Sequence, residues 1–267
     1  MTVAWVDLAY VLAAILFILG LKALGRASTA RRGNLLSAGG MLVAIVATLL
    51  RSGIDPLWVG IGLAVGAVVG AVAARTVQMT QMPEMVALFN GSGGIASFFV
   101  AWAEFHGDPA RDVGTAAAIA AAAIIGSLAA TGSVVAWGKL AGRVPSRPIR
   151  IPMQSLVTAA MAAVVLAAAV TLALVPDSGW GVAAFAVLSL LALALGALLV
   201  LPIGGADMPI VISLLNAYTG LAAAMAGFAL GNSALVVAGS LVGAAGFILT
   251  QIMCKAMNRS LTNVLFG

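Results

Sequence analysis

Two segments of the chain, Met82–Gly94 and Met208–Gly220, carry the same motif of polar residues set in apolar sequence. Met, Pro, Leu, Asn and Gly recur at equal spacing, so Asn90 and Asn216 each follow a proline by seven residues. At about 1.5 Å per helical residue, each asparagine would lie roughly 10 Å along a helix, about a third of the way into the hydrocarbon of a membrane. A carboxamide at that depth needs partners, and such groups usually face a bundle interior or a water-filled cavity. Asn90 and Asn216 are therefore candidates for one polar pathway, and hydrogen bonding between helices is the alternative.

The start of each motif is suited to begin a helix. A proline in the first turn loses nothing by lacking an N–H that would be unpaired there. We expect Asp207 to be the N-cap of the second motif helix, and Glu84 to be an acid in the first turn of the other, where the helix dipole favours it.

Proton transfer along such a pathway would need a titrating group, and this sequence places no Asp, Glu, Lys or His in the middle third of any predicted span. The single histidine, His106, lies between Glu104 and Asp108 and is expected in a solvated loop. A partner subunit would have to supply the missing group.

Other chemistries are excluded by composition. With one cysteine, Cys254, and one histidine, the chain has no internal disulfide and no Cys/His metal site, so we expect no metal. The stretch 91–96 fits a permissive dinucleotide-binding pattern, but it lies inside an apolar span and not between a strand and a helix, where the pattern has meaning.

The elements that position these residues are membrane helices. Of the 267 residues, 63% are hydrophobic and only 8% charged, which excludes a soluble domain. The apolar runs are too long and continuous for the strands of a membrane barrel. We predict an all-α integral membrane protein, a bundle of about nine transmembrane helices forming a single domain over residues 1–267. The predicted spans are 5–24, 34–50, 56–75, 83–104, 114–138, 153–175, 180–201, 208–230 and 233–254.

Charge predicts the orientation of the bundle. On this assignment of spans, eleven of the thirteen basic residues fall on one side, and only Arg51 and Arg111 fall on the other. The excess marks the cytoplasmic side, which puts the N-terminus outside and the C-terminus in the cytoplasm.

Glycines at helical spacing predict close contacts between helices. One set is Gly62, Gly66 and Gly70, and another is Gly239 and Gly243 followed by Gly246. Small residues at such spacing let helix backbones approach each other.

The stretch 204–209 with Ser213 and Asn216, continuing to 253–260, closely resembles the β subunit of proton-translocating NAD(P) transhydrogenase. Met82-Pro83-Glu84 and the stretch 131–140 are also similar to that family, and the resemblance covers essentially the whole chain. It implies the membrane domain of an enzyme that couples hydride transfer between NAD(H) and NADP(H) to proton movement across the bacterial cytoplasmic (inner) membrane.

The resemblance also implies roles for single residues. It makes Asn90, Ser133, Ser213 and Asn216 members of the proton pathway, with Asn90 where many members have a histidine. Coupling and hinge positions would be Glu84, Asp207, Lys255 and Arg259, and Gly239, Gly243 and Gly246 would belong to the glycine-lined last helix. No catalytic residue is expected in this chain.

The family further implies partners and cofactors. NAD(H) and NADP(H) would be bound outside this chain, and the soluble NADP(H)-binding domain is expected to be absent from it. The expected partners are the α membrane subunit, which would supply a channel histidine, the NAD(H)-binding domain, the chain's own NADP(H)-binding domain and a second protomer. A secondary transporter of a small solute and a structural assembly subunit are the alternative functions, because Gly-rich helices near Asn and Ser also build substrate sites.

Overall fold

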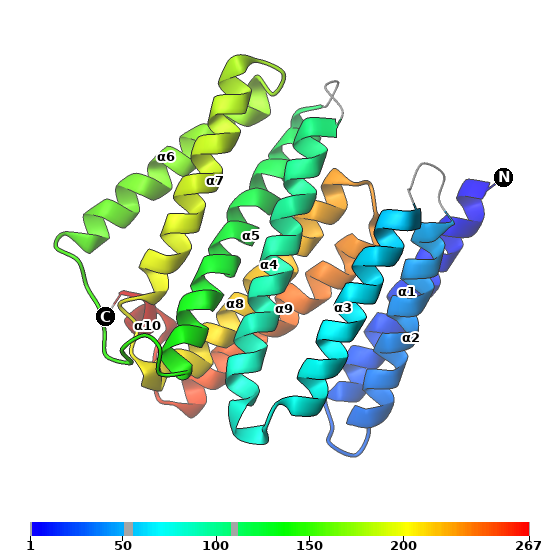
Figure 1. Ribbon diagram of the computed structural model, residues 1–267, viewed down its shortest axis with the longest axis horizontal. Coiled ribbons are helices and arrows are strands. Elements are labelled where there is room, and N and C mark those ends of the chain that lie inside the picture. Colours follow the sequence, from blue (N-terminus) through cyan, green and yellow to red (C-terminus); the bar gives the residue numbers. More distant parts are fainter. Residues whose placement is uncertain (1, 51–55, 108–111, 267) are drawn as a thin grey trace. The chain divides into compact units, whose positions relative to one another are not determined.

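The protein is helical throughout the part that the structure describes. The structure is a computed structural model, and it describes residues 2–50, 56–107 and 112–266. Within these ranges nine helices are long and apolar enough to cross a membrane, and there is no strand, which confirms the predicted all-α membrane class. The helices are α1 (Thr2–Leu24), α2 (Ala30–Leu49), α3 (Pro56–Thr76), α4 (Met82–Gly107), α5 (Val113–Leu140), α6 (Gln154–Leu174), α7 (Gly179–Val200), α8 (Met208–Ala229), α9 (Ser233–Ala256) and the short α10 (Leu261–Phe266), with 3-10 turns at Met79–Gln81 and Gly205–Asp207 (Figure 1).

Three residues used in the sequence interpretation lie outside the described ranges. They are Arg51 and Arg111, which are expected on the outer side, and Asp108. The orientation of the termini therefore stays a prediction from charge. His106 differs from expectation, because it is exposed but belongs to the last turn of α4, with Nδ1 2.8 Å from the carbonyl oxygen of Trp102.

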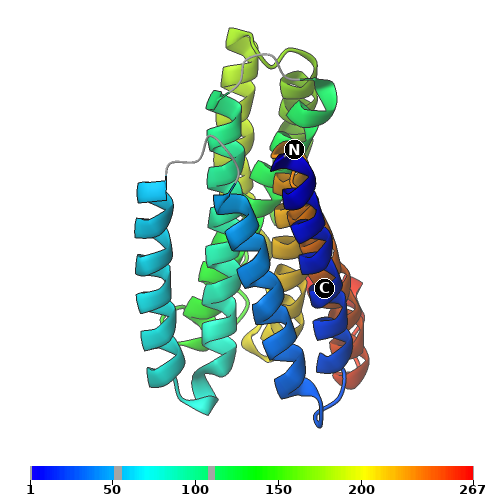
Figure 2. The same ribbon diagram turned by 90° about the vertical axis from the view of Figure 1, so that its right-hand side faces the viewer.

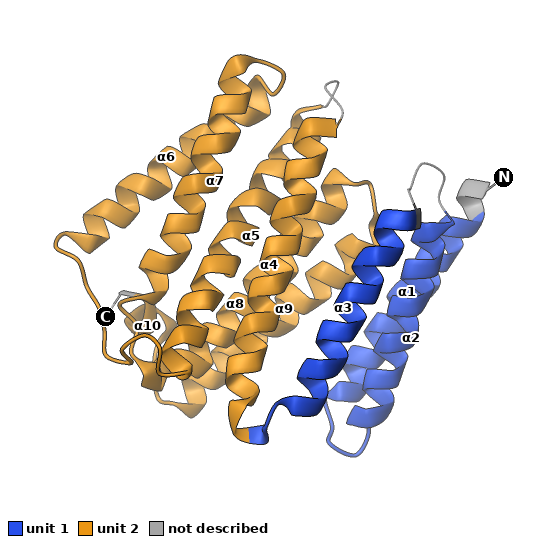
Figure 3. Cartoon of the chain, viewed as in Figure 1, with its two compact units in different colours: residues 1–79 blue, residues 80–267 orange. Residues whose placement is uncertain are grey.

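The chain divides into two compact units, Met1–Met79 and Thr80–Gly267 (Figure 3). In the first unit, α1 and α2 pack together as a helical hairpin (Figure 2). Gly20 and Gly33 lie where these helices meet: a Cβ on Gly33 would be 2.8 Å from the carbonyl oxygen of Gly20. The hydroxyls of Tyr10 and Thr48, 3.0 Å apart, link the two helices farther along.

Inside the first unit, Gly62, Gly66 and Gly70 have no close contact with another helix. Among the described residues of α3 none is buried, and a Cβ on any of these three glycines would meet no atom within 4 Å. Within the first unit these glycines therefore make no close contact, and the expected contact stays a prediction.

In the second unit, α5 is the central helix. It packs against α4, α7 and α8, and over a smaller contact against α6. Its sequence consists mostly of Ala, Gly, Ser and Thr, and fifteen of its residues are buried. Small side chains let several helices approach one axis: a Cβ on Gly94 of α4 would be 2.6 Å from the carbonyl oxygen of Gly126 of α5, closer than real Cβ contacts come.

The last two long helices, α8 and α9, meet through glycine. Gly239, Gly243 and Gly246 of α9 are all buried and face α8. A Cβ on Gly239 would lie 2.7 Å from the carbonyl oxygen of Gly220, and one on Gly246 would lie 2.7 Å from the backbone nitrogen of Ala217. This stripe is a close helix contact, unlike that of α3.

Side chains fix several helix starts. The Asp112 carboxylate caps α5 by accepting a hydrogen bond of 2.8 Å from the backbone N–H of Thr115, and this bond lowers the pKa of Asp112 below its usual value. Asn232 caps α9 in the same way through Leu235. Asp207 occupies the N-cap position of α8, but its side chain makes no capping bond.

The contrast between the two glycine stripes gives a first prediction. Gly239→Leu should destabilise the solubilised protein by about 1–3 kcal/mol, because the side chain must enter a contact between two backbones. Gly66→Leu, at a position without a neighbour inside the first unit, is the matched control and should leave the thermal midpoint within about a degree of wild type, since exposed substitutions cost little. Equal losses in the two variants, measured by thermal unfolding in one detergent, would contradict the assignment of the α8–α9 contact.

Candidate functional site

The two repeated motifs begin α4 and α8, which pack side by side in the second unit. Glu84 and Pro209 both lie in first turns, as expected. Asn90 is buried, and its Nδ2 donates a hydrogen bond of 3.0 Å to the carbonyl oxygen of Ile212. In return, the Thr219 hydroxyl of α8 donates to the carbonyl oxygen of Asn90 at 3.0 Å. The two motifs are therefore joined by a pair of side chain to backbone hydrogen bonds.

Ser133 of α5 lies beside this junction. A Cβ placed on Gly91, the neighbour of Asn90, would be 3.2 Å from the Cβ of Ser133. The Ser133 hydroxyl is fully buried and has no hydrogen-bond partner among the described residues. A buried hydroxyl normally has a partner, so this position is suited to a bound water molecule.

On its other side, α8 is joined to α9 by side-chain hydrogen bonds. The Ser213 hydroxyl donates to the carbonyl oxygen of Gly246 at 3.1 Å, and the Thr250 hydroxyl lies 3.1 Å from that of Ser213 and 2.8 Å from the same carbonyl oxygen. Both side chains are buried. The absence of a side chain on Gly246 leaves its carbonyl open to both hydroxyls.

Asn216 lies between these two sets of bonds. Its Nδ2 is 3.0 Å from the position that a Cβ on Gly246 would take. It is only half-buried, and within the described part of the chain its carboxamide makes no hydrogen bond. Two donors and an acceptor therefore remain available at the boundary between α8, α4 and α9.

We call these six residues the α8 polar cluster: Asn90, Ser133, Ser213, Asn216, Thr219 and Thr250. Thr219 and Thr250 are not among the residues singled out from the sequence. Helical spacing contained the signal for both, since Thr219 follows Asn216 by three residues and Thr250 follows Gly246 by four. The cluster can hold polar molecules such as water, but it contains no acid or base.

The expected coupling residues lie at one end of the second unit. Asp207 forms an ion pair with Arg259, with 3.2 Å between Oδ1 and Nε. This contact explains why the carboxylate does not cap α8. Lys255 is exposed in the last turn of α9, and Glu84 is half-buried with no ion pair inside the described ranges. The structure brings Asp207 and Arg259 together and leaves the other two apart.

The end of α9 places Arg259. Asn258 has a φ of 51°, and the backbone N–H of Arg259 donates to the carbonyl oxygen of Cys254 at 2.9 Å. The backbone N–H of Asn258 donates to the carbonyl oxygen of Lys255 at 3.2 Å. The two bonds together form a Schellman motif, with Asn258 in the left-handed conformation usually adopted by Gly. The motif stops the helix and directs Arg259 back to Asp207.

Lys139, at the end of α5, lies in the stretch 131–140 that resembles the family, but the sequence interpretation gave it no role of its own. Its side chain is 1% exposed, and its Nζ donates to the carbonyl oxygens of Leu201 at 2.6 Å, Ile203 at 2.7 Å and Arg147 at 3.3 Å. Within the described ranges it pairs with no carboxylate. The ammonium group therefore caps the C-terminal end of α7 and fixes the segment that leads to Asp207.

The fold and the cluster together define a class: a multi-pass helical membrane protein in which buried polar side chains join three or more helices around α8. Comparison with known sequences identifies the family. The family model for the NAD(P) transhydrogenase beta subunit matches residues 6–267, so the chain belongs to that family. The predicted resemblance is confirmed.

Relatives of this chain include the NAD(P) transhydrogenase subunit beta of Rhodospirillum rubrum. It is 41% identical over 268 residues, which are 97% of this chain and 57% of the relative. The same subunit from a named strain of that species matches to the same extent. The chain therefore spans a little over half the length of the curated relatives it matches.

The environment of Lys139 gives a second prediction. Lys139→Met keeps the length of the side chain but leaves buried carbonyl oxygens without a donor, which should cost about 1–3 kcal/mol of stability. Lys255→Met, at an exposed position, is the control. Thermal unfolding of both variants measures the difference, and an unchanged midpoint for Lys139→Met would show that the three hydrogen bonds contribute nothing net.

Proposed function

We propose that this chain is the proton-conducting membrane part of NAD(P) transhydrogenase. In the whole enzyme, hydride passes between NADH and NADP+ in soluble domains, and a proton crosses the membrane. NAD(H) and NADP(H) are then bound outside this chain, and the enzyme resides in the bacterial cytoplasmic membrane. Membership of the beta-subunit family supports this proposal, as do the nine long apolar helices among the described residues.

The observation that carries the pathway is the position of Asn216. It is the one asparagine of the α8 polar cluster whose carboxamide is unbonded in the described part of the chain, and it is half-buried between two bonded sets of polar groups. Water molecules held by Asn216 and by the buried Ser133 hydroxyl would relay protons past α8.

The cluster lacks a titrating group, so a partner subunit must contribute one. We propose that a histidine on the α membrane subunit approaches α8 at Asn216, because histidine titrates near neutral pH. The NAD(H)-binding domain, the NADP(H)-binding domain of the beta chain and a second protomer complete the assembly.

Coupling requires that the state of NADP(H) change contacts at the end of the bundle. We propose that Asp207 and Arg259 form this switch, and that Glu84, in the first turn of α4, and Lys255, in the last turn of α9, take part in coupling without contacting the ion pair. A nucleotide can shift the equilibrium between two channel states only if it interacts differently with each of them. The ion pair has an exposed Arg259, so it costs little to break, which suits a contact that opens and closes.

A third prediction tests the pathway. In proteoliposomes of the intact enzyme with a pH-sensitive dye inside, Asn216→Leu should reduce proton uptake during reverse transhydrogenation at least about tenfold, since apolar substitution removes the group that holds water. Asn34→Leu, on the exposed face of α2, is the matched control. Unchanged proton uptake in Asn216→Leu would show that Asn216 contributes only to packing.

A fourth prediction tests the switch. Asp207→Asn should lower coupled proton movement more than hydride exchange between bound nucleotides, because it removes the ion pair and leaves the nucleotide sites intact. Asp177→Asn, at an exposed position after α6, is the control. Equal loss of both activities would mean that Asp207 maintains structure, and full retention of coupling would remove it from the switch.

A further inference from the structure

The α8 polar cluster is bounded by apolar side chains toward one end of the second unit. At the end that carries Asp207 and Arg259, α4 and α8 begin and α5 and α9 end (Figure 1). One helical turn from each of four cluster residues toward that end lies a buried residue of one hydrophobic core. The pairs are Asn90 and Ala87, Ser133 and Ala136, Ser213 and Ile210, and Thr250 and Cys254.

Six buried residues of this core come from α4, α5, α8, α9 and α10, and we call them the apolar layer: Ala87, Ala136, Met208, Ile210, Cys254 and Val264. A buried free cysteine behaves as a small hydrophobic side chain, so Cys254 fits this description. Protons cross a protein along hydrogen-bonded groups and water, and an apolar constriction excludes water. The layer therefore separates the α8 polar cluster from the ion pair of Asp207 and Arg259.

Val264 links the apolar layer to the ion pair. It lies on α10, a helix of six residues, whereas the other five layer residues lie on or at the start of long helices. Val264 follows Arg259 by five residues, and its backbone N–H donates to the carbonyl oxygen of Ser260 at 3.1 Å. Arg259 in turn is held by Asp207 at 3.2 Å. A displacement of Arg259 would therefore carry α10 with it and draw Val264 out of the layer.

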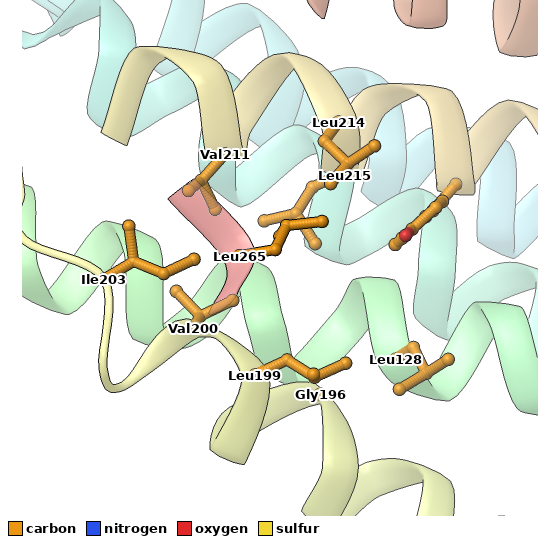
Figure 4. Close-up of a pocket in the computed structure, with 10 residues that line it drawn as sticks. Leu128, Gly196, Leu199, Val200, Ile203, Val211, Leu214, Leu215 and Leu265 are labelled. Atoms are coloured by element: carbon orange, nitrogen blue, oxygen red, sulfur yellow. The ribbon is translucent and has the colours of Figure 1, made fainter. Parts of the chain in front are cut away.

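The core beside the layer is not completely filled. An apolar cavity of about 200 Å³ lies between α7 and α8 over α5 (Figure 4). Val200, Ile203 and Val211 line it and belong to the same hydrophobic core as the layer. Leu265 of α10, the neighbour of Val264, lies among the lining side chains of α7 and α8 (Figure 4). The cavity gives the side chains of α10 room to move, and an apolar cavity stays dry until polar groups enter it.

We propose that the apolar layer is the barrier that blocks proton movement between the α8 polar cluster and this end of the bundle. Breaking the ion pair of Asp207 and Arg259 releases α10 and withdraws Val264, so that water enters the layer. The inference rests on the proposed proton-conducting function, and it deepens that function by naming the residues that prevent a leak.

Passive proton leak through the intact enzyme tests the barrier. The enzyme is reconstituted in liposomes without nucleotides, a potassium diffusion potential is imposed with valinomycin, and a pH-sensitive dye inside reports proton entry. Ala136→Ser places a hydroxyl in the layer, and Val264→Thr replaces a methyl group by a hydroxyl of similar volume. The matched controls, buried in another core, are Ala123→Ser on α5 and Val165→Thr on α6.

We expect each layer variant to leak about fivefold faster than wild type, since a hydroxyl in the layer gives a water molecule about one net hydrogen bond. Both controls should leak as wild type. Arg259→Gln, which breaks the ion pair, should raise the leak to a similar extent. Adding Asn216→Leu to Ala136→Ser should return the leak to the wild-type rate, because water held at Asn216 leads to the layer. If Ala136→Ser lowers the thermal midpoint, Cys254→Ser replaces it with the same expectation.

Three results would overturn the proposal. A wild-type leak in both layer variants would show that the layer does not limit proton movement, even where Asn216→Leu still abolishes coupled proton uptake and the proposed function stands. Equal leaks in layer variants and controls would show a general loosening of the bundle. An unchanged leak in Arg259→Gln would show that the ion pair does not hold the layer closed.

The proposed function fails by a different result. A leak in Ala136→Ser that persists after the addition of Asn216→Leu would keep the barrier at the apolar layer but remove Asn216 from the proton path.

Discussion

The close approach of helices to α5 is the constraint on which the second unit depends. Lipid is as apolar as leucine, so helices in a bilayer gain little from burying apolar surface against each other, and contact must come from packing and hydrogen bonds. An axis of Ala, Gly and Ser permits that contact on several sides at once. Because these side chains are small, they also leave backbone carbonyl oxygens uncovered, so that the hydroxyl and amide groups of neighbouring helices can reach them.

The α8 polar cluster follows from this approach. Asn90 reaches the backbone of Ile212, and Ser213 reaches that of Gly246, only because glycine lies at or beside each crossing. Asn216 has the same chemistry but lies half-exposed at the edge, with its carboxamide unbonded within the described ranges. The difference between a bonded and an unbonded asparagine is therefore one of position on the helix, and residue type does not reveal it.

Much of the fold could be predicted from the sequence because hydrocarbon thickness sets helix length. Pro83 and Pro209 correctly indicated where α4 and α8 begin, whereas α2 begins at Ala30 and includes Arg31 and Arg32, which the predicted span 34–50 left out. The contacts between helices were harder to predict from the sequence. Spacing gave Gly66 and Gly243 the same expectation, although within its own compact unit Gly243 packs against another helix and Gly66 does not. Lys139 looked like any basic residue at a helix end, since its three acceptors are backbone atoms far away in sequence.

Those acceptors have an evolutionary consequence. Lys139, Asn90, Ser213 and Thr219 all donate to main-chain oxygens. A main-chain oxygen is the same whatever side chain is attached, so Ile203 or Ile212 could be exchanged for another apolar residue without loss of the bond. Selection would then act on the donor alone, and the contact would leave no paired substitution in related sequences. Statistical covariation between positions would therefore not detect the bonds that join α4 to α8, α8 to α9 and α5 to the end of α7.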